Sequence, residues 1–219
     1  MVQNYLLMSI LLVQLNNMTI IQDAIHLEQG TDEWKRARLG DAVMAKGKSG
    51  ESITRKKYKV RLAAERLTGE ISESFTSAAM EWGVVNEEKA AMAYEVSKDT
   101  FLDRTGFWKH TSIPWLGCSP DRLAGSDGLV EIKCPDTSTH IDYWLAKQVP
   151  PEYAKQVQGQ IWVMERDWCD FASYDPRLPE KNRLLIVRAY RDDKLIKQME
   201  EEVKKFLNEV EELIIKLGE

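Results

Sequence analysis

Histidine and cysteine are scarce in this sequence of 219 residues, which contains three of each. The histidines are scattered, and the cysteines stand at wide spacing with no Cys-x-x-Cys pair. These absences argue against a zinc site, a disulfide framework, a four-cysteine iron–sulfur cluster and a histidine-based triad. They favour a reducing, cytoplasmic setting. The chemistry is therefore sought among carboxylates, lysines and amides.

Long apolar runs are also lacking. Residues 5–13 are apolar, but this run is too short to span a bilayer, and no basic leader precedes it. We therefore expect no membrane association. Residues 1–17 are interpreted as an N-terminal extension outside the fold, with Met18 as the alternative natural start. No repeat or Pro/Gly-rich linker divides residues 18–219, so we expect them to form a single domain.

The charge is unevenly distributed along the chain, although the net charge of −5 is modest. Residues 34–66 contain eleven Lys or Arg against three acids, which gives this window a charge of +8. One interpretation is a solvated charged surface, and the other is a basic face that follows DNA phosphates. The window alone does not decide between them.

The hydrophobic pattern predicts helices alternating with strands. Helices are expected at 54–68, ending at Gly69, and at 77–97, 153–165 and 195–217. Strands are expected at 101–108, 115–118, 129–134, 170–174 and 184–190, with the second and third joined by a turn at 124–128. This order predicts an α/β fold in which helices flank a central mixed β-sheet.

The most informative stretch runs from Cys118-Ser119-Pro120-Asp121 to Glu131-Ile132-Lys133. Strand alternation places Glu131 and Lys133 on one face of the sheet and Ile132 on the other. A hairpin across the intervening turn would bring Asp121 beside Glu131. Two carboxylates in one small site favour a hard divalent cation such as Mg²⁺. Glu-x-Lys alone is more often an exposed charge pair, but this one is flanked by apolar residues.

Several ordered motifs together resemble a known family. The pattern is similar to that of the phage lambda exonuclease group (the YqaJ-like viral recombinases) of the PD-(D/E)xK nuclease superfamily, whose core is restriction-endonuclease-like. The resemblance covers most of the chain from about residue 27 onward. It rests on Glu28-Gln29-Gly30 with Trp34, Arg38-Leu39-Gly40, Trp82-Gly83 with Glu87, Ser119-Pro120-Asp121, Glu131-Ile132-Lys133-Cys134-Pro135, Gln156-Val157-Gln158 and Tyr174-Asp175-Pro176-Arg177.

The resemblance implies a role for each matching residue. Asp121, Glu131, the carbonyl of Ile132 and Glu87 would hold two metal ions, Mg²⁺ or alternatively Mn²⁺. Lys133 and Gln156 would position the attacking water. The 5′-phosphate of a DNA end would be bound by Arg38 and Ser119, and Met80 would split the terminal base pair. One departure stands at Ala45, where the family has a hydroxyl residue; Lys46, Lys48 or Ser49 are candidate substitutes for that donor.

The family's activity is likewise implied by the resemblance. Its members digest one strand of double-stranded DNA from the 5′ end, processively, as ring-shaped homotrimers, and work beside a single-strand annealing recombinase. We therefore expect a Mg²⁺-dependent 5′→3′ exonuclease that acts in recombination in the cytoplasm, encoded by a bacterium or a phage. The alternatives are an endonuclease or junction resolvase of the same fold, and a catalytically silent DNA-binding module.

Overall fold

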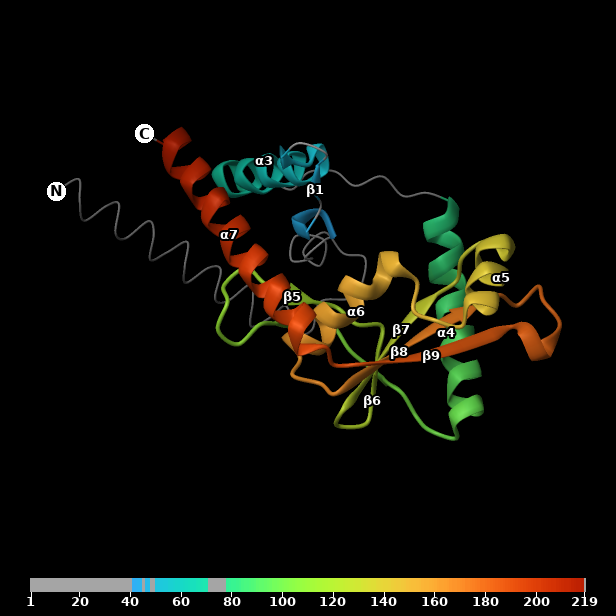
Figure 1. Cartoon of the computed structure of the whole chain (residues 1–219). Coiled ribbons are helices and arrows are strands. Elements are labelled where there is room, and N and C mark those ends of the chain that lie inside the picture. Colours follow the sequence, from blue (N-terminus) through green and yellow to red (C-terminus); the bar gives the residue numbers. More distant parts are fainter. Residues whose placement is uncertain (1–40, 45, 48–49, 71–77, 219) are drawn as a thin grey trace.

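The computed structural model describes residues 41–44, 46–47, 50–70 and 78–218 (Figure 1). At its centre lies a five-stranded sheet in which β7 and β8 pair in parallel and every other neighbouring pair is antiparallel. The sheet is therefore mixed, as predicted. Its strands follow the order β3 (Asp103–Arg104), β6 (Arg122–Ala124), β7 (Gly128–Lys133), β8 (Trp168–Tyr174) and β9 (Leu184–Tyr190).

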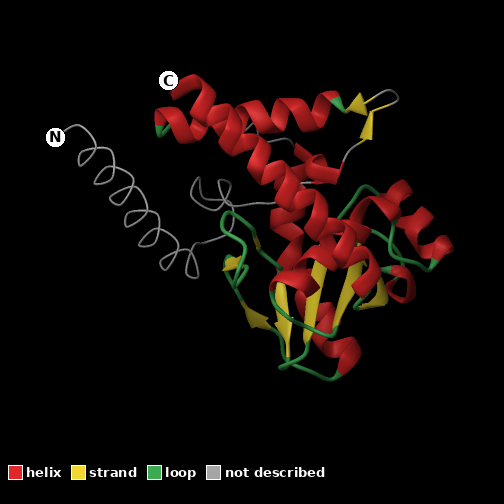
Figure 2. Ribbon diagram, turned by 60° about the vertical axis from the view of Figure 1, so that its left-hand side comes forward, coloured by secondary structure: helices red, strands yellow, loops and turns green. Residues whose placement is uncertain are grey.

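Helices cover both faces of this sheet (Figures 1 and 2). Helix α4 (Ala78–Lys98) packs on one face, where Val130 and Ile132 of β7 join its core. Helices α6 (Pro151–Val163) and α7 (Asp193–Gly218) share a second core with Leu129 on the opposite face. Alternate residues of β7 thus face different helices, which is the period-two pattern of a strand buried on both sides.

Helix α3 (Ile53–Thr68) confirms the helix predicted from the sequence. Its first turn is capped by the Ser52 hydroxyl, which accepts a hydrogen bond from the backbone N–H of Arg55 at 3.0 Å. Its last turn ends at Gly69 with φ of 73°, a left-handed conformation that glycine adopts without steric cost. Both ends of this helix are therefore set by local sequence.

An ionic cluster fastens α3 to the C-terminal helix. The buried Arg55 guanidinium donates to Glu209 at 2.6 and 3.1 Å and to Glu51 at 2.6 Å. Lys59 joins the same two carboxylates, both at 2.9 Å. Below the cluster, Tyr58 stacks on Phe206 of α7 with ring centroids 5.4 Å apart. Part of the basic window is thus neutralised inside the protein.

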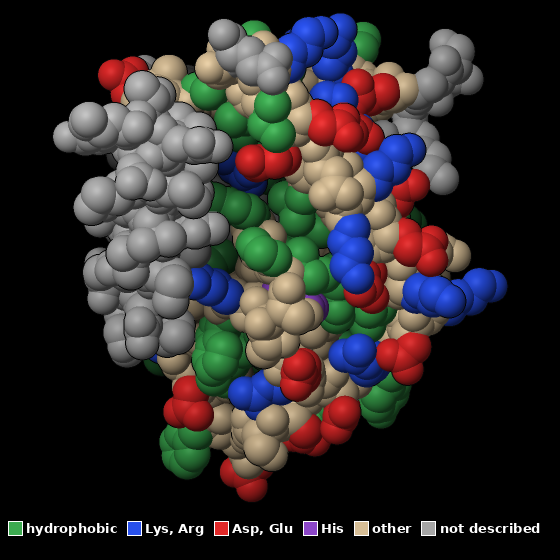
Figure 3. Space-filling view, turned by 90° about the vertical axis from the view of Figure 1, so that its left-hand side faces the viewer, with side chains coloured by type: hydrophobic (Ala, Val, Ile, Leu, Met, Phe, Trp, Pro, Cys, Tyr) green, Lys and Arg blue, Asp and Glu red, His purple; other side chains and the backbone are tan. Residues whose placement is uncertain are grey.

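Two further cations of α3, Arg61 and Arg66, also lie beside acidic residues. Arg66 lies 3.6 Å from Glu211 and over the ring of Trp115, and Arg61 lies 3.8 Å from Glu65. Figure 3, which views the molecule from the side of α3 and α7, shows basic and acidic side chains interspersed. Within the described residues, a solvated mixed surface is therefore the better interpretation of the part of the window in α3.

Two predicted details of the central region are wrong. The expected strand at 101–108 is replaced by β3 and by the separate β4 (Trp108–Lys109), which pairs only with β5 (Gly117–Cys118). The hairpin partner of β7 is therefore β6, not the segment 115–118. The short, irregular pairing of β4 and β5 lacks the alternation that would reveal it.

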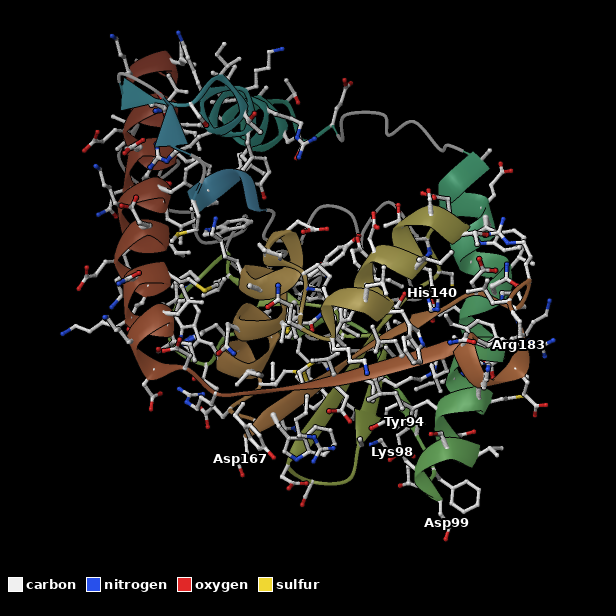
Figure 4. All side chains as sticks on the ribbon, turned by 45° about the vertical axis from the view of Figure 1, so that its right-hand side comes forward. Tyr94, Lys98, Asp99, His140, Asp167 and Arg183 are labelled. Atoms are coloured by element: carbon white, nitrogen blue, oxygen red, sulfur yellow. The ribbon has the colours of Figure 1, made fainter. Side chains whose placement is uncertain are left out.

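The helix α5 (Thr137–Ala146) was missing from the predicted order of elements. Asp136 caps its first turn, accepting from the backbone N–H of Thr139 at 3.1 Å. Its ten residues include threonine, histidine and β-branched side chains with weak helix preference, so the cap and tertiary packing determine it. His140 of this helix is buried, and its ring nitrogens lie 2.7 Å from the Ser173 hydroxyl and 2.9 Å from the carbonyl oxygen of Asn182 (Figure 4).

Smaller elements complete the described chain. They are the short helices η2 (Asp41–Met44) and η3 (Glu180–Asn182) and the hairpin of β1 (Lys46–Gly47) with β2 (Gly50–Glu51). The proposed extension at 1–17 lies outside the described residues, so the predicted domain boundary stays a prediction. No helix in the described ranges is long and apolar enough to cross a membrane.

We predict that Glu209→Gln lowers the free energy of unfolding by about 1–3 kcal/mol at pH 7, because Arg55 loses a charged partner. The paired cations hold the pKa of Glu209 down at about 2. A lowered carboxyl pKa stabilises the fold above the ordinary value near 4.5. That contribution disappears as the pH falls toward 2. The difference between parent and variant should shrink over this window in urea titrations.

Glu211→Gln is the matched control, since Glu211 lies on the same helix with a side chain 60% exposed. Its effect should stay within about 0.5 kcal/mol at every pH. Equal effects of the two substitutions would show that the Arg55 cluster does not hold α3 to α7.

Candidate active site

The hairpin of β6 and β7 brings the two predicted carboxylates together. Arg122 pairs with Val130, and this antiparallel register, continued by one residue, sets Asp121 opposite Glu131. The Asp121 Oδ2 atom accepts a hydrogen bond from the backbone N–H of Ile132 at 2.6 Å. Asp121 is thereby held beside the strand that carries Glu131 and Lys133.

The Glu131 carboxylate is almost completely buried, with its side chain 1% exposed. Three side chains compensate its charge. Lys133 and Gln156 both donate to Oε1, the amide at 2.5 Å, and the Nε2 of Gln160 donates to Oε2 at 2.6 Å. A buried carboxylate requires such donors, and here one strand neighbour and one helix supply them all.

The surroundings of Asp121 make its carboxyl group hard to ionise. Burial raises the pKa of Asp121 to about 8, and repulsion from Glu131 adds to the effect. Burial by itself would lower the pKa of Lys133, but attraction by Glu131 and Asp121 outweighs it and raises that pKa above its ordinary value. Lys133 therefore stays an ammonium at neutral pH. In this form it is a hydrogen-bond donor and not a base.

These residues fit a hard divalent cation. The two carboxylates repel each other, and burial disfavours ionisation of Asp121. A positive charge placed between them would stabilise the ionised pair. Mg²⁺ requires only one or two protein carboxylates and keeps several waters. Among the described residues, no group of three or more Asp, Glu, His or Cys side chains is placed to hold a metal ion, so this site offers two carboxylates.

Glu87 comes from α4 on the neighbouring side of the site. Its Oε1 accepts from the buried Arg122 guanidinium at 2.7 Å, while Glu88 accepts from the same guanidinium at 2.8 Å. Its negative charge also contributes to the raised pKa of Asp121. Glu87 is therefore close to the carboxylate pair but held by an arginine, and its place among the metal ligands stays a prediction.

The other predicted residues are placed less fully. Ser119, half-buried just after β5, donates to the carbonyl of Gly106 at 3.3 Å. Met80 belongs to the first turn of α4. Arg38 lies outside the described residues, as do Ala45, Lys48 and Ser49. The structure therefore joins Asp121, Glu131, Lys133 and Gln156 but leaves the phosphate pocket as a prediction.

Two contacts of the site go beyond the residues inferred from sequence. Gln160 completes the compensation of Glu131, and the ring of Tyr153 lies 5.0 Å below the Lys133 ammonium. The spacing Gln-x-x-x-Gln, which puts two amides on one helix face, could have revealed Gln160. Gln158, by contrast, is not a surface amide. It is buried and bridges Tyr190 to Asp192, with both bonds 2.8 Å long.

Part of the chain matches a known protein family. Residues 33–167, more than half of the chain, match the model of the YqaJ-like viral recombinase domain. The chain belongs to this family. The resemblance drawn from the motifs is thereby confirmed. A shorter relative, the protein ExoD of Escherichia coli (strain K12), is 33% identical over 66 residues, or 30% of this chain and 75% of ExoD.

Solved structures agree with this family assignment. The chain is similar to the alkaline exonuclease LHK-Exo of Laribacter hongkongensis, with 37% identity and a TM-score of 0.78 over 86% of this chain and 96% of that one. The complex of LHK-Exo with dAMP gives 39% identity and a TM-score of 0.77 over 85% and 96%. A phage-related exonuclease from Haemophilus somnus 129PT, 20% identical with a TM-score of 0.65 over 80% and 92%, supports the fold alone.

We predict that Asp121→Asn stabilises the metal-free protein at alkaline pH. Because the pKa of Asp121 is raised from 3.8 to about 8, the folded state binds a proton more tightly than the unfolded state in that window. The parent's free energy of unfolding should therefore fall as the pH rises from 4 to 8. The neutral amide removes this dependence and should add at least about 1.4 kcal/mol at pH 8.5, the value of one pKa unit.

Denaturant titrations in EDTA measure this effect, with Asp103→Asn on the exposed β3 as control. The control should follow the parent at all pH values. If Asp121→Asn also followed the parent throughout, neither burial nor the charge of Glu131 would be raising the pKa of Asp121.

Proposed function

We propose that this protein is a Mg²⁺-dependent exodeoxyribonuclease that digests one strand of double-stranded DNA from its 5′ ends. The observation that carries the proposal is the half-buried Asp121 beside the buried Glu131, with Lys133 on the same strand face as Glu131. Family membership and the similarity to LHK-Exo, an alkaline exonuclease, support it. The direction of digestion and the metal are the finer parts of the proposal.

The side chains of Asp121 and Glu131 and the carbonyl of Ile132 would hold Mg²⁺, or Mn²⁺ in its place, and Glu87 would join them if it exchanged Arg122 for metal. We propose two ions at this site. When bound, they would neutralise phosphate charge and lower the pKa of the attacking water. The carbonyl of Ile132 follows the Glu131 side chain directly along β7, so both donors move with one rigid strand.

Lys133 and Gln156 would act on the reacting groups themselves. Both donate to the Oε1 atom of Glu131, and both are half-buried, so Oε1 is on the side of this carboxylate that lies nearer to solvent. The ammonium can orient the water and stabilise charge developing on the phosphate oxygens, because its raised pKa keeps it protonated. The Gln156 amide adds a neutral donor that fixes the position of the water.

The products follow from which bond is cleaved. Water attacks the phosphorus that links the first two nucleotides, and the bond from phosphorus to the O3′ of the first nucleotide breaks. The leaving O3′ gains a proton, and the next nucleotide keeps a 5′-phosphate. Each cycle therefore recreates the phosphorylated end that Arg38 and Ser119 would bind. Met80 at the start of α4 would separate the terminal base pair.

The proposal extends to assembly and setting by family membership. We propose a ring-shaped homotrimer around the duplex that works with a single-strand annealing recombinase in DNA recombination. A single strand left by 5′ digestion is the substrate such a partner needs. Because the substrate is cellular or phage DNA, we expect the enzyme to act in the bacterial cytoplasm.

Digestion of three DNAs, each with Mg²⁺ or with EDTA, tests the function. They are linear duplex with 5′-phosphates, the same duplex with 5′-hydroxyls, and covalently closed circles. We expect metal-dependent loss of the phosphorylated linear DNA and intact circles. Equal loss of both linear forms would mean a weakened phosphate pocket, in line with Ala45. Cut circles would identify an endonuclease, and no cutting would leave a silent binding module.

We also predict that Lys133→Met lowers the cleavage rate by about 10²–10³-fold, because the developing charge loses its nearest ammonium. Binding to DNA should change little, since Lys133 is one of many cations. Rates come from single-turnover release of nucleotides, and binding from fluorescence anisotropy in Ca²⁺. The control is Lys98→Met. Lys98 is the exposed last residue of α4 and is labelled in Figure 4. A Lys133→Met enzyme as fast as the control would remove Lys133 from the mechanism.

A further inference from the structure

We propose that Gln160 is a positioning residue that fixes the Glu131 carboxylate in the orientation needed to bind metal. This inference rests on the proposed function. The observation behind it is that the Gln160 Nε2 atom donates to Glu131 Oε2 at 2.6 Å, with the Gln160 residue 2% exposed. The donor is thus behind the carboxylate, away from solvent, in the core shared by α6 and the sheet.

The two amides of α6 have different duties toward Glu131. Gln156 and Gln160 are four residues apart and therefore lie on one helix face. Gln156 is half-buried and shares Oε1 with Lys133, whereas Gln160 is buried and takes Oε2. Oε1 can exchange its donors for a cation from the open side. Oε2 keeps its donor, so the plane of the carboxylate is preserved during that exchange.

The orientation of the Gln160 amide is itself determined. An amide can present either oxygen or nitrogen, and an oxygen facing Glu131 would repel it. The Cys169 Sγ atom on β8 lies 3.9 Å from the Gln160 Oε1 atom and 3.9 Å from the carbonyl oxygen of Asp170, so its single proton has two acceptors. The Glu131 carboxylate itself therefore turns Nε2 toward it. Burial raises the pKa of the Cys169 thiol well above its ordinary value, so the thiol keeps its proton. Gln160 thus lies between the Cys169 thiol and the Glu131 carboxylate, with its short hydrogen bond to Glu131.

Loss of this donor should weaken metal binding while leaving the reacting groups in place. Glu131 would then sample other side-chain rotamers, and ordering it would oppose binding. Residues that orient metal ligands through hydrogen bonds typically contribute about 10–100-fold in metal affinity. Lys133 and Gln156 are untouched, so the rate at saturating metal should change far less than the metal dependence.

The test compares Gln160→Met with Gln158→Met in the full-length protein. Both substitutions replace a buried amide of α6 with an apolar side chain of similar length. Gln158 also makes two hydrogen bonds, but it makes them to Tyr190 and Asp192 and none to Glu131. Mn²⁺ affinity is measured calorimetrically without DNA. The cleavage rate is then measured across a Mg²⁺ titration.

We expect Gln160→Met to weaken Mn²⁺ binding about 10–100-fold and to raise the Mg²⁺ midpoint equally, with kcat at saturation within about threefold of the parent. Gln158→Met should keep the parent's affinity within about threefold. Parent-like affinity in Gln160→Met, or equal weakening in both variants, would overturn the proposal. A parent that binds no Mn²⁺ would overturn it together with the metal site.

The role of Gln160 and the proposed nuclease activity are tested independently of each other. If the parent binds Mn²⁺ and Gln160→Met binds it weakly, the role of Gln160 holds even when no DNA is cut. A second measurement needs no substitution and so does not depend on a variant that folds. In nuclear magnetic resonance of the parent, Mg²⁺ should shift the Gln156 side-chain amide but leave the Gln160 amide protected from exchange. Loss of protection at Gln160 on metal addition would overturn the inference.

Discussion

Burial of the Glu131 carboxylate is the constraint on which the site depends. An uncompensated carboxylate in the core is costly, so donors must reach both of its oxygens. The parallel pairing of β7 with β8 provides the means, because parallel strands need a crossover connection, and this crossover contains α5 and α6. Helix α6 then lies over the face of β7 that carries Glu131. The topology of the sheet and the chemistry of the site are therefore one arrangement.

The outcome for the sequence predictions depends on how local their signals are. Helix α3 has a capping serine and a terminal glycine, and β7 is a short apolar run that follows a turn, so both were predictable. The pairing of β4 with β5 was not, since two-residue strands have no period to detect. Helix α5 was missed because a cap at Asp136 and contacts with β8 decide it rather than residue preference.

In the site too, residues with local sequence signals were predictable and long-range contacts were not. Asp121, Glu131 and Lys133 follow from strand alternation and one hairpin, and the structure indeed brings them together with Gln156. The partner of Glu87 could not be predicted. Only the register of β6 shows that Arg122 faces α4, and this register is not evident from the sequence. The cations Arg55 and Lys59 likewise looked available for DNA in sequence, yet residues far along the chain neutralise them.

The ionic cluster of Arg55 joins residues that are separated by 154 positions in the sequence. Helix α3 therefore finishes its packing only after α7, the last of the described elements, has left the ribosome. During synthesis the buried arginine and the apolar face around Tyr58 have no C-terminal partner, although the central sheet is already complete through β9. The packing of α3 is thus completed by residues made much later in synthesis. A stalled or truncated chain would expose this unfilled surface to cellular proteases and chaperones.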